Sequence, residues 1–118
     1  MARKTSKRRS SRRLRSNGLE VAETILQQMG GGRRLKAMIG AYDFLGSEKD
    51  RELQFKWKAK ARNGANAITI SLDPSDTYTL KFWKIRAGKV TKIEEMEGVY
   101  DDMLRSIFED RTGLYLRM

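Results

Sequence analysis

The stretch 68–86, ITISLDPSDTYTLKFWKIR, contains two segments in which every second residue is apolar. The apolar positions are Ile68, Ile70 and Leu72 in the first segment and Tyr78, Leu80 and Phe82 in the second. A period of two is that of a β-strand with one buried face. The residues Asp73-Pro74-Ser75-Asp76 between the segments are typical of a tight turn. We therefore predict two neighbouring strands, with Lys81 and Trp83 on the face turned away from the core.

Ile85 falls on the polar side of the second strand. This break in the alternation predicts either a bulge near Phe82 and Trp83 or an edge position for the strand. Trp83 would fill the core instead if such a bulge reversed its direction, so its orientation is left open here.

The same alternation extends to both sides of this stretch. Leu35, Ala37 and Ile39 predict one more strand, and Leu53, Phe55 and Trp57 predict another. Asn63-Gly64 and Ala87-Gly88 are turn sequences, and a shorter strand at 89–96 is predicted after the second of them.

Helical spacing replaces the alternation near the two ends of the chain. Residues 18–29 have an apolar face that ends at Gly30-Gly31-Gly32, and a second apolar stripe runs from Val99 to Phe108, with Gly113 placed to end that helix. We also expect Leu114 and Leu116 to pack back onto the core. The prediction is an α+β fold, a single antiparallel sheet of four to five strands with both helices on one face, formed by residues 17–118.

The 118-residue chain has neither cysteine nor histidine. This composition excludes disulfides, thiolate nucleophiles and Cys-based zinc sites, and it removes the commonest general bases and metal ligands. No apolar run is long enough to span a bilayer, and the basic start lacks the apolar stretch of a secretory signal. We expect a cytoplasmic protein without a membrane association, or a nuclear one if the host has a nucleus.

Residues 1–16, MARKTSKRRSSRRLRS, form an arm that contains eight bases and no acid. These bases are Arg3, Lys4, Lys7, Arg8, Arg9, Arg12, Arg13 and Arg15. With one Leu and no aromatic residue, the arm cannot bury enough apolar surface to offset the entropy of ordering, so we predict that it is disordered when free. Arginine suits phosphate because its guanidinium group binds bidentately. A solubilising or targeting tail is the alternative interpretation.

The outward face of the predicted sheet is also basic. It would collect Arg34, Lys36, Lys56, Lys58, Lys81 and Trp83, and Lys60 and Arg62 on the following loop would extend it. No acid is expected among these residues. Lysines spaced across a sheet suit a phosphate backbone, and an exposed Trp can stack on a base. The alternative is that these lysines only keep the sheet soluble and prevent edge pairing.

Catalysis has little support in the sequence. A metal-dependent nuclease needs only carboxylates and a lysine, and residues of these types are present as Asp43, Glu52, Lys56, Asp73 and Asp76. Their spacing does not place an acid, a second acid and a lysine on one strand face, and Asp73 and Asp76 belong to a turn. The glycines at 30–32 lack the features of a phosphate loop. We expect no enzyme activity, no cofactor and no metal.

Three stretches together resemble small uncharacterised proteins encoded by bacteriophages and prophages. They are ETILQQMGGGRRLKAMIGA, ITISLDPSDTYTLKFWKIR and EGVYDDMLRSIFEDRTGLYLRM, and the similarity covers about residues 22–118. The resemblance implies expression in a bacterial cytoplasm and brings no established activity. The arm lies outside it.

These observations lead to one functional prediction and one alternative. The prediction is a nucleic-acid-binding accessory protein that contacts DNA or RNA mainly through phosphates, by its arm and its basic sheet face. If all eight arm bases met phosphates, affinity would fall roughly 10⁴-fold between about 50 and 200 mM salt. The alternative is a protein-interaction or virion component whose arm contacts an acidic host factor, a ribosome or a packaged genome.

Overall fold

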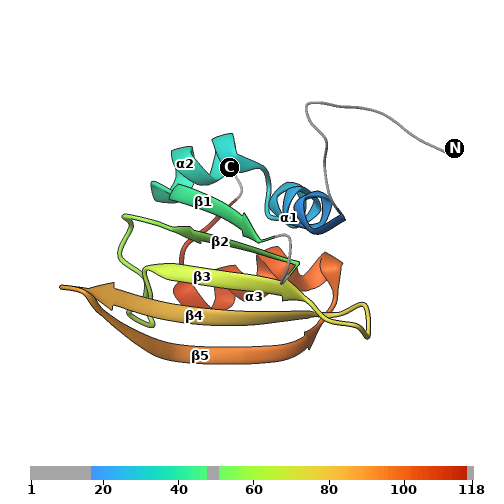
Figure 1. Cartoon of the computed structure of the whole chain (residues 1–118). Coiled ribbons are helices and arrows are strands. Elements are labelled where there is room, and N and C mark those ends of the chain that lie inside the picture. The colour runs from blue at the N-terminus through green and yellow to red at the C-terminus, as the bar shows by residue number, and fades with distance from the viewer. Residues whose placement is uncertain (1–16, 48–50, 117–118) are drawn as a thin grey trace, which may run out of the picture.

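The strands follow one another across a single antiparallel sheet in chain order (Figure 1). They are β1 (Tyr42–Ser47), β2 (Glu52–Lys56), β3 (Ala67–Leu72), β4 (Tyr78–Arg86) and β5 (Lys89–Val99). This computed structural model describes residues 17–47 and 51–116. The α+β fold and the antiparallel sheet are confirmed, whereas the prediction of a disordered arm concerns residues outside the described part.

Three helices pack on one face of the sheet. They are α1 (Asn17–Gln28), α2 (Gly32–Ile39) and α3 (Leu104–Thr112), and a 3-10 turn, η1 (Asp101–Met103), leads into α3. Their buried side chains form one core cluster with the inward residues of β2, β3 and β4. Phe108 of α3 lies at its centre, with its ring 6.4 Å from that of Phe55, 5.2 Å from Trp57 and 6.3 Å from Phe82. The opposite face of the sheet carries none of the described helices (Figure 1).

The strand predicted around Leu35 and Ile39 is wrong, because this segment is the helix α2. Leu35 and Ile39 are buried one helical turn apart, whereas Ala37, which alternation would place beside them, is exposed. Gly40 ends the helix in the left-handed conformation, with φ 70°. The same apolar residues fit both periods over so short a segment, and the glycines on either side favour the helix.

β1 was not predicted, since it shows almost no alternation. Of its six residues only Phe44 and Ser47 are half-buried and the other four are exposed. The register shifts between Tyr42 and Leu45, and Asp43 has a φ of 55°. This bulge brings the Asp43 carboxylate next to Lys56 of β2.

The bulge predicted near Phe82 and Trp83 is confirmed. Trp83 pairs with Lys92 while Phe82 pairs with Glu94, so β5 has one extra residue at this point. Trp83 keeps its outward direction, since its side chain reaches Thr69 on the open face. β5 is longer than predicted and ends at Val99.

The helix predicted to start at Val99 begins later. Val99 is buried as the last residue of β5, Tyr100 and Met103 are exposed, and the α-helix starts at Leu104. Gly113 ends it with a φ of 74°, as predicted. The prediction that the C-terminal leucines return to the core is confirmed, since Leu116 is buried and Leu114 packs against the cluster.

Candidate nucleic-acid interface

An antiparallel sheet whose strands follow chain order has its alternate connections at opposite ends. One end holds the β2–β3 loop (57–66) and the β4–β5 turn, which lie together on one side of Figure 1. The other end holds the β3–β4 turn and the passage from β5 into η1. The charges differ sharply between these two ends.

We define the basic end as six exposed bases on the β2–β3 loop and the β4–β5 hairpin. They are Lys58, Lys60, Arg62, Lys84, Arg86 and Lys89. Residues 57–66 and 83–92 contain no acid. None of the six forms an ion pair with a residue in the described ranges. Their charges are thus available to an external anion.

Asn66 holds the loop against the hairpin. Its side-chain amide donates to the carbonyl of Ile85 at 2.8 Å, and its side-chain oxygen accepts from the backbone N–H of Ile85 at 2.9 Å. Its own backbone N–H donates to the carbonyl of Trp83 at 2.8 Å. Segments about twenty residues apart in sequence are therefore fixed side by side at this end.

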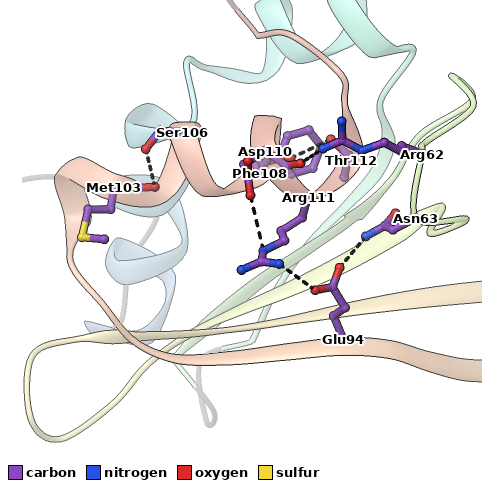
Figure 2. A network of polar contacts seen from close by, with 9 residues as sticks. All are labelled: Arg62, Asn63, Glu94, Met103, Ser106, Phe108, Asp110, Arg111 and Thr112. Carbon is purple, nitrogen blue, oxygen red and sulfur yellow. Dashed lines mark hydrogen bonds and ion pairs between the residues drawn. The ribbon is translucent and has the colours of Figure 1, made fainter.

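Other contacts fix the loop to α2 and α3. The backbone N–H groups of Lys58 and Ala59 donate to the carbonyl of Ile39. Arg62 caps the end of α3, since its backbone N–H donates to the carbonyl of Thr112 at 2.6 Å and its guanidinium group donates to the carbonyl of Asp110 (Figure 2). Arg62 therefore has a structural role besides its charge, because it satisfies carbonyls that a helix end leaves unpaired.

Two acids close to the loop, Glu94 and Asp110, are already bound to other groups. Figure 2 shows Arg111 between Glu94 and Asp110, with nitrogen to oxygen distances of 3.6 Å to each carboxylate. Asn63 also donates to Glu94 at 3.1 Å. Arg111 thus partly neutralises these acids and reduces their competition for the bases of the loop.

The opposite end of the sheet is acidic. Its acids are Asp73, Asp76, Glu97, Asp101 and Asp102. Asp73 accepts a hydrogen bond from Thr79 at 2.6 Å, in keeping with a turn residue. Arg51 and Arg105 are exposed bases at this end. The fold therefore separates positive and negative charges along the strand direction.

The open sheet face differs from the prediction, because it does carry acids. Lys56 forms an ion pair with Asp43, with 3.5 Å between Nζ and Oδ2. Lys81 lies directly opposite Glu95 of β5. Glu52 accepts a hydrogen bond from Ser71 at 3.1 Å. The expectation of an acid-free face is wrong: Glu52 stands two residues before Gln54 on the same strand, and Asp43 and Glu95 lie on strands whose outward residues were not assigned from the sequence.

The positive neighbours of Glu95 affect the pKa of its carboxyl. A hydrogen bond from Lys92, with a nitrogen to oxygen distance of 2.6 Å, and the positive charges of Lys92 and Lys81 lower the pKa of the Glu95 carboxyl below its ordinary value. Lys92 and Lys81 therefore serve partly as partners of Glu95, which makes them weaker candidates for phosphate binding than the basic end.

A hollow of about 400 Å³ lies on this open face. Trp83 lines it and is half-buried, and its indole Nε1 donates to Thr69 Oγ1 at 3.0 Å. The lining charges are Asp43 and Glu52 against Lys56 and Lys81, so they balance. The hollow is a neutral, partly apolar depression beside the basic end.

The predicted binding residues are thus not all brought together. Lys58, Lys60 and Arg62 belong to the basic end, whereas Lys56, Lys81 and Trp83 line the hollow. Arg34 and Lys36 are on α2, and Arg34 lines a separate depression with Asp101 and Asp102. The arm residues Arg3 to Arg15 lie outside the described part of the chain.

The sequence analysis missed Lys84, Arg86 and Lys89. A signal for them was present, since the whole run 83–92 lacks an acid. They do not occupy outward positions of the predicted sheet, and they are accessible because they lie near the hairpin end. A face-by-face assignment cannot identify such residues.

Within the described ranges, no group of three or more acids lies close enough to hold a metal ion, and no helix is long and apolar enough to cross a membrane. No family model, curated protein or solved structure matches this chain.

Proposed function

We propose that this protein binds DNA or RNA mainly through phosphate groups, using the basic end of the domain together with the basic arm. The observation that carries the proposal is the joining of two acid-free segments at one end of the sheet by Asn66 and Ile85. Six exposed bases without internal ion pairs form a positive surface there. Lysine and arginine on such a surface release counterions when they meet a polyanion.

The strength of this interaction depends on how many phosphates are contacted. Four contacts to duplex DNA predict a slope of about −3.6 in a plot of log affinity against log salt, a loss of roughly 150-fold between about 50 and 200 mM salt. Contacts by the arm would make the slope steeper. Binding by phosphates alone carries no sequence information, so we expect weak sequence preference.

The basic end supports this function better than the open sheet face. Lys56 has Asp43 as a partner at 3.5 Å, and Lys81 faces Glu95 across β4 and β5. A phosphate at either lysine would compete with an internal carboxylate, whereas a phosphate near Arg86 or Lys89 would not. Within the domain, the basic end is thus the main source of affinity for phosphate groups.

The experiment compares labelled double- and single-stranded oligonucleotides over a range of salt concentrations. It uses the full-length protein and a full-length variant in which the eight arm bases are replaced by glutamine. We expect salt-sensitive binding by both proteins, with a shallower slope for the variant. An absence of binding to either oligonucleotide at low salt would refute the proposal. If a protein partner from host lysate then co-purified with this protein even after nuclease treatment, that result would favour the protein-interaction alternative.

A bacteriophage or prophage origin is part of this proposal, and it rests on the resemblance expected from the three stretches within residues 22–118 quoted above. In that setting the nucleic acid would be met in a bacterial cytoplasm or in association with a nucleoid or a virion.

A further inference from the structure

We infer that the hollow on the open sheet face is a subsite for one unpaired base of a single-stranded nucleic acid, with the indole of Trp83 as its stacking surface. This inference rests on the proposed function, which it makes more specific. The volume of the hollow, about 400 Å³, lies within the range of small-ligand sites.

The indole is held in place before any ligand binds. Its Nε1 donates to Thr69 Oγ1 at 3.0 Å, which joins neighbouring strands on the open face. Trp83 is half-buried, so part of its ring remains accessible. A fixed aromatic surface costs little conformational entropy on binding, and stacking on it accepts any base.

The hollow that Trp83 lines also has apolar side chains that are exposed and do not belong to the core. Leu45 and Val90, which also line the hollow, are 55% and 58% exposed. Both belong to the edge strands β1 and β5, on the face that the described helices leave open. Because β1 and β5 are opposite edges of the sheet, a base stacked on Trp83 of β4 can cover Val90 of the neighbouring strand but not Leu45 as well. Covering Val90 removes apolar area from water, which stabilises the complex.

The hollow and the basic end differ in charge, so they suit different parts of a nucleotide. The carboxylates of Asp43 and Glu52 balance Lys56 and Lys81 around the hollow, which suits an uncharged base better than a phosphate. The acid-free β4–β5 hairpin begins next to Trp83, with Lys84, Arg86 and Lys89. Lys84 and Arg86 alternate with Trp83 and Ile85, which line the hollow, and Lys89 lies opposite Arg86, so these three bases are on the other face of the hairpin. A single strand with one base in the hollow can therefore reach them with its phosphates by passing around the end of the hairpin.

Gln54 supplies a polar group for the edge of that base. It lines the hollow, it is exposed, and its side chain has no hydrogen bond with any of the residues 17–47 and 51–116. An amide has both donors and an acceptor, so it can pair with any base edge. A base within a duplex is stacked and paired on that edge, so the subsite selects single strands.

Fluorescence provides the test, because the two tryptophans differ in accessibility. Trp57 is 2% exposed in the core, whereas Trp83 faces the hollow. The probes are an oligothymidylate and an abasic oligonucleotide of the same length, added to the full-length protein. We expect the oligothymidylate to change the tryptophan emission and the abasic probe to leave it almost unchanged. In Trp83→Phe, where only Trp57 emits, neither probe should change the emission.

Affinity gives an independent readout. We expect Trp83→Ala to bind the oligothymidylate about tenfold more weakly and the abasic probe equally well, with an unchanged salt slope. Trp83→Phe should keep most of the preference for the thymidylate, since a phenyl ring also stacks. If Trp83→Ala does not fold, the emission of the wild-type protein and of Trp83→Phe still decides the question.

The outcomes separate the subsite from the proposed function. Equal binding of both probes without a change in Trp83 emission overturns the subsite and leaves phosphate binding intact. No binding of either probe removes both. A change of Trp83 emission with protein concentration in the absence of oligonucleotide assigns the hollow to a second copy of this chain, which also overturns the inference.

Discussion

Asn66 and Ile85 are joined by a reciprocal pair of hydrogen bonds, from Asn66 Nδ2 to the Ile85 carbonyl at 2.8 Å and from the Ile85 N–H to Asn66 Oδ1 at 2.9 Å. Asn66 thus continues the pairing of β3 with β4 beyond Ala67, the last residue of the regular ladder. This side chain determines where the β2–β3 loop lies, and with it the position of Lys58, Lys60 and Arg62 relative to the hairpin.

Replacement of Asn66 by alanine should lower the free energy of unfolding by about 1–3 kcal/mol, because two backbone groups of Ile85 lose their partners in a partly buried place. Denaturant unfolding measures this loss. Gln54→Ala is the matched control, since Gln54 is an exposed amide, and its effect should stay within about 0.5 kcal/mol. Equal midpoints for the two variants would show that the Asn66 side chain does not anchor the loop.

Gly113 should tolerate alanine less well than Gly64. Both have a positive φ, 74° and 84°, so both substitutions strain the backbone. A Cβ at Gly113 would lie 3.3 Å from Cβ of Arg62, whereas nothing lies within 4 Å of a Cβ at Gly64. Gly113→Ala should therefore cost about 1 kcal/mol or more and exceed the cost of Gly64→Ala. Thermal unfolding of both variants checks the order, and a larger loss for Gly64→Ala would contradict the packing described around Arg62.

The carboxyl of Glu95 should respond to its two lysine neighbours. Its pKa is lowered by the hydrogen bond from Lys92 and by the charges of Lys92 and Lys81. Lys92→Met should raise this pKa toward the ordinary value, and Lys81→Met should raise it by less. Because the folded-state pKa is depressed, the stabilisation exists above the unfolded pKa and is lost as the pH falls through the folded one.

A titration of Glu95 by side-chain NMR measures these shifts. Lys89→Met serves as the control, since Lys89 forms no ion pair with a described residue. A larger shift for Lys81→Met than for Lys92→Met would contradict the contacts assigned to Glu95.

Much of the fold could be predicted because its central strands alternate cleanly. Leu53 and Phe55 of β2 and Trp57, the residue after it, are all buried, and Tyr78, Leu80 and Phe82 of β4 are too. The break in the alternation at Ile85 also pointed to a bulge or an edge position, and the structure has the bulge, whereas the direction of Trp83 stayed open until the structure showed it turned outward. These strands are covered on one face only, which is the situation that a period of two reports.

The edges of the fold could not be predicted in the same way. α2 has only Leu35 and Ile39 fully buried, and two residues do not define a period. β1 is an edge strand that buries little, so its sequence shows no pattern. The acidic partners of Lys56 and Lys81 were missed for the same reason, because Asp43 and Glu95 come from the two edge strands.

The basic end could also be predicted only in part from the direction of the side chains on each strand. Lys58 was predicted on the outward sheet face, and Lys60 and Arg62 on the loop that follows it. Their neighbours on the hairpin depend on the contact between Asn66 and Ile85. Residues 66 and 85 have no sequence feature that marks them as partners. Only the three-dimensional structure brings the two acid-free segments to one place.

The most direct test of the central claim measures how the affinity for duplex DNA depends on salt in two double variants of the full-length protein. Arg86→Gln/Lys89→Gln removes two charges from the basic end, and Arg51→Gln/Arg105→Gln removes two exposed charges from the acidic end. If the basic end contacts phosphates, the first variant loses about 1.8 units of slope while the second keeps the wild-type slope. Equal losses in both variants would mean that affinity follows net charge alone, and the basic end would then not be the binding surface.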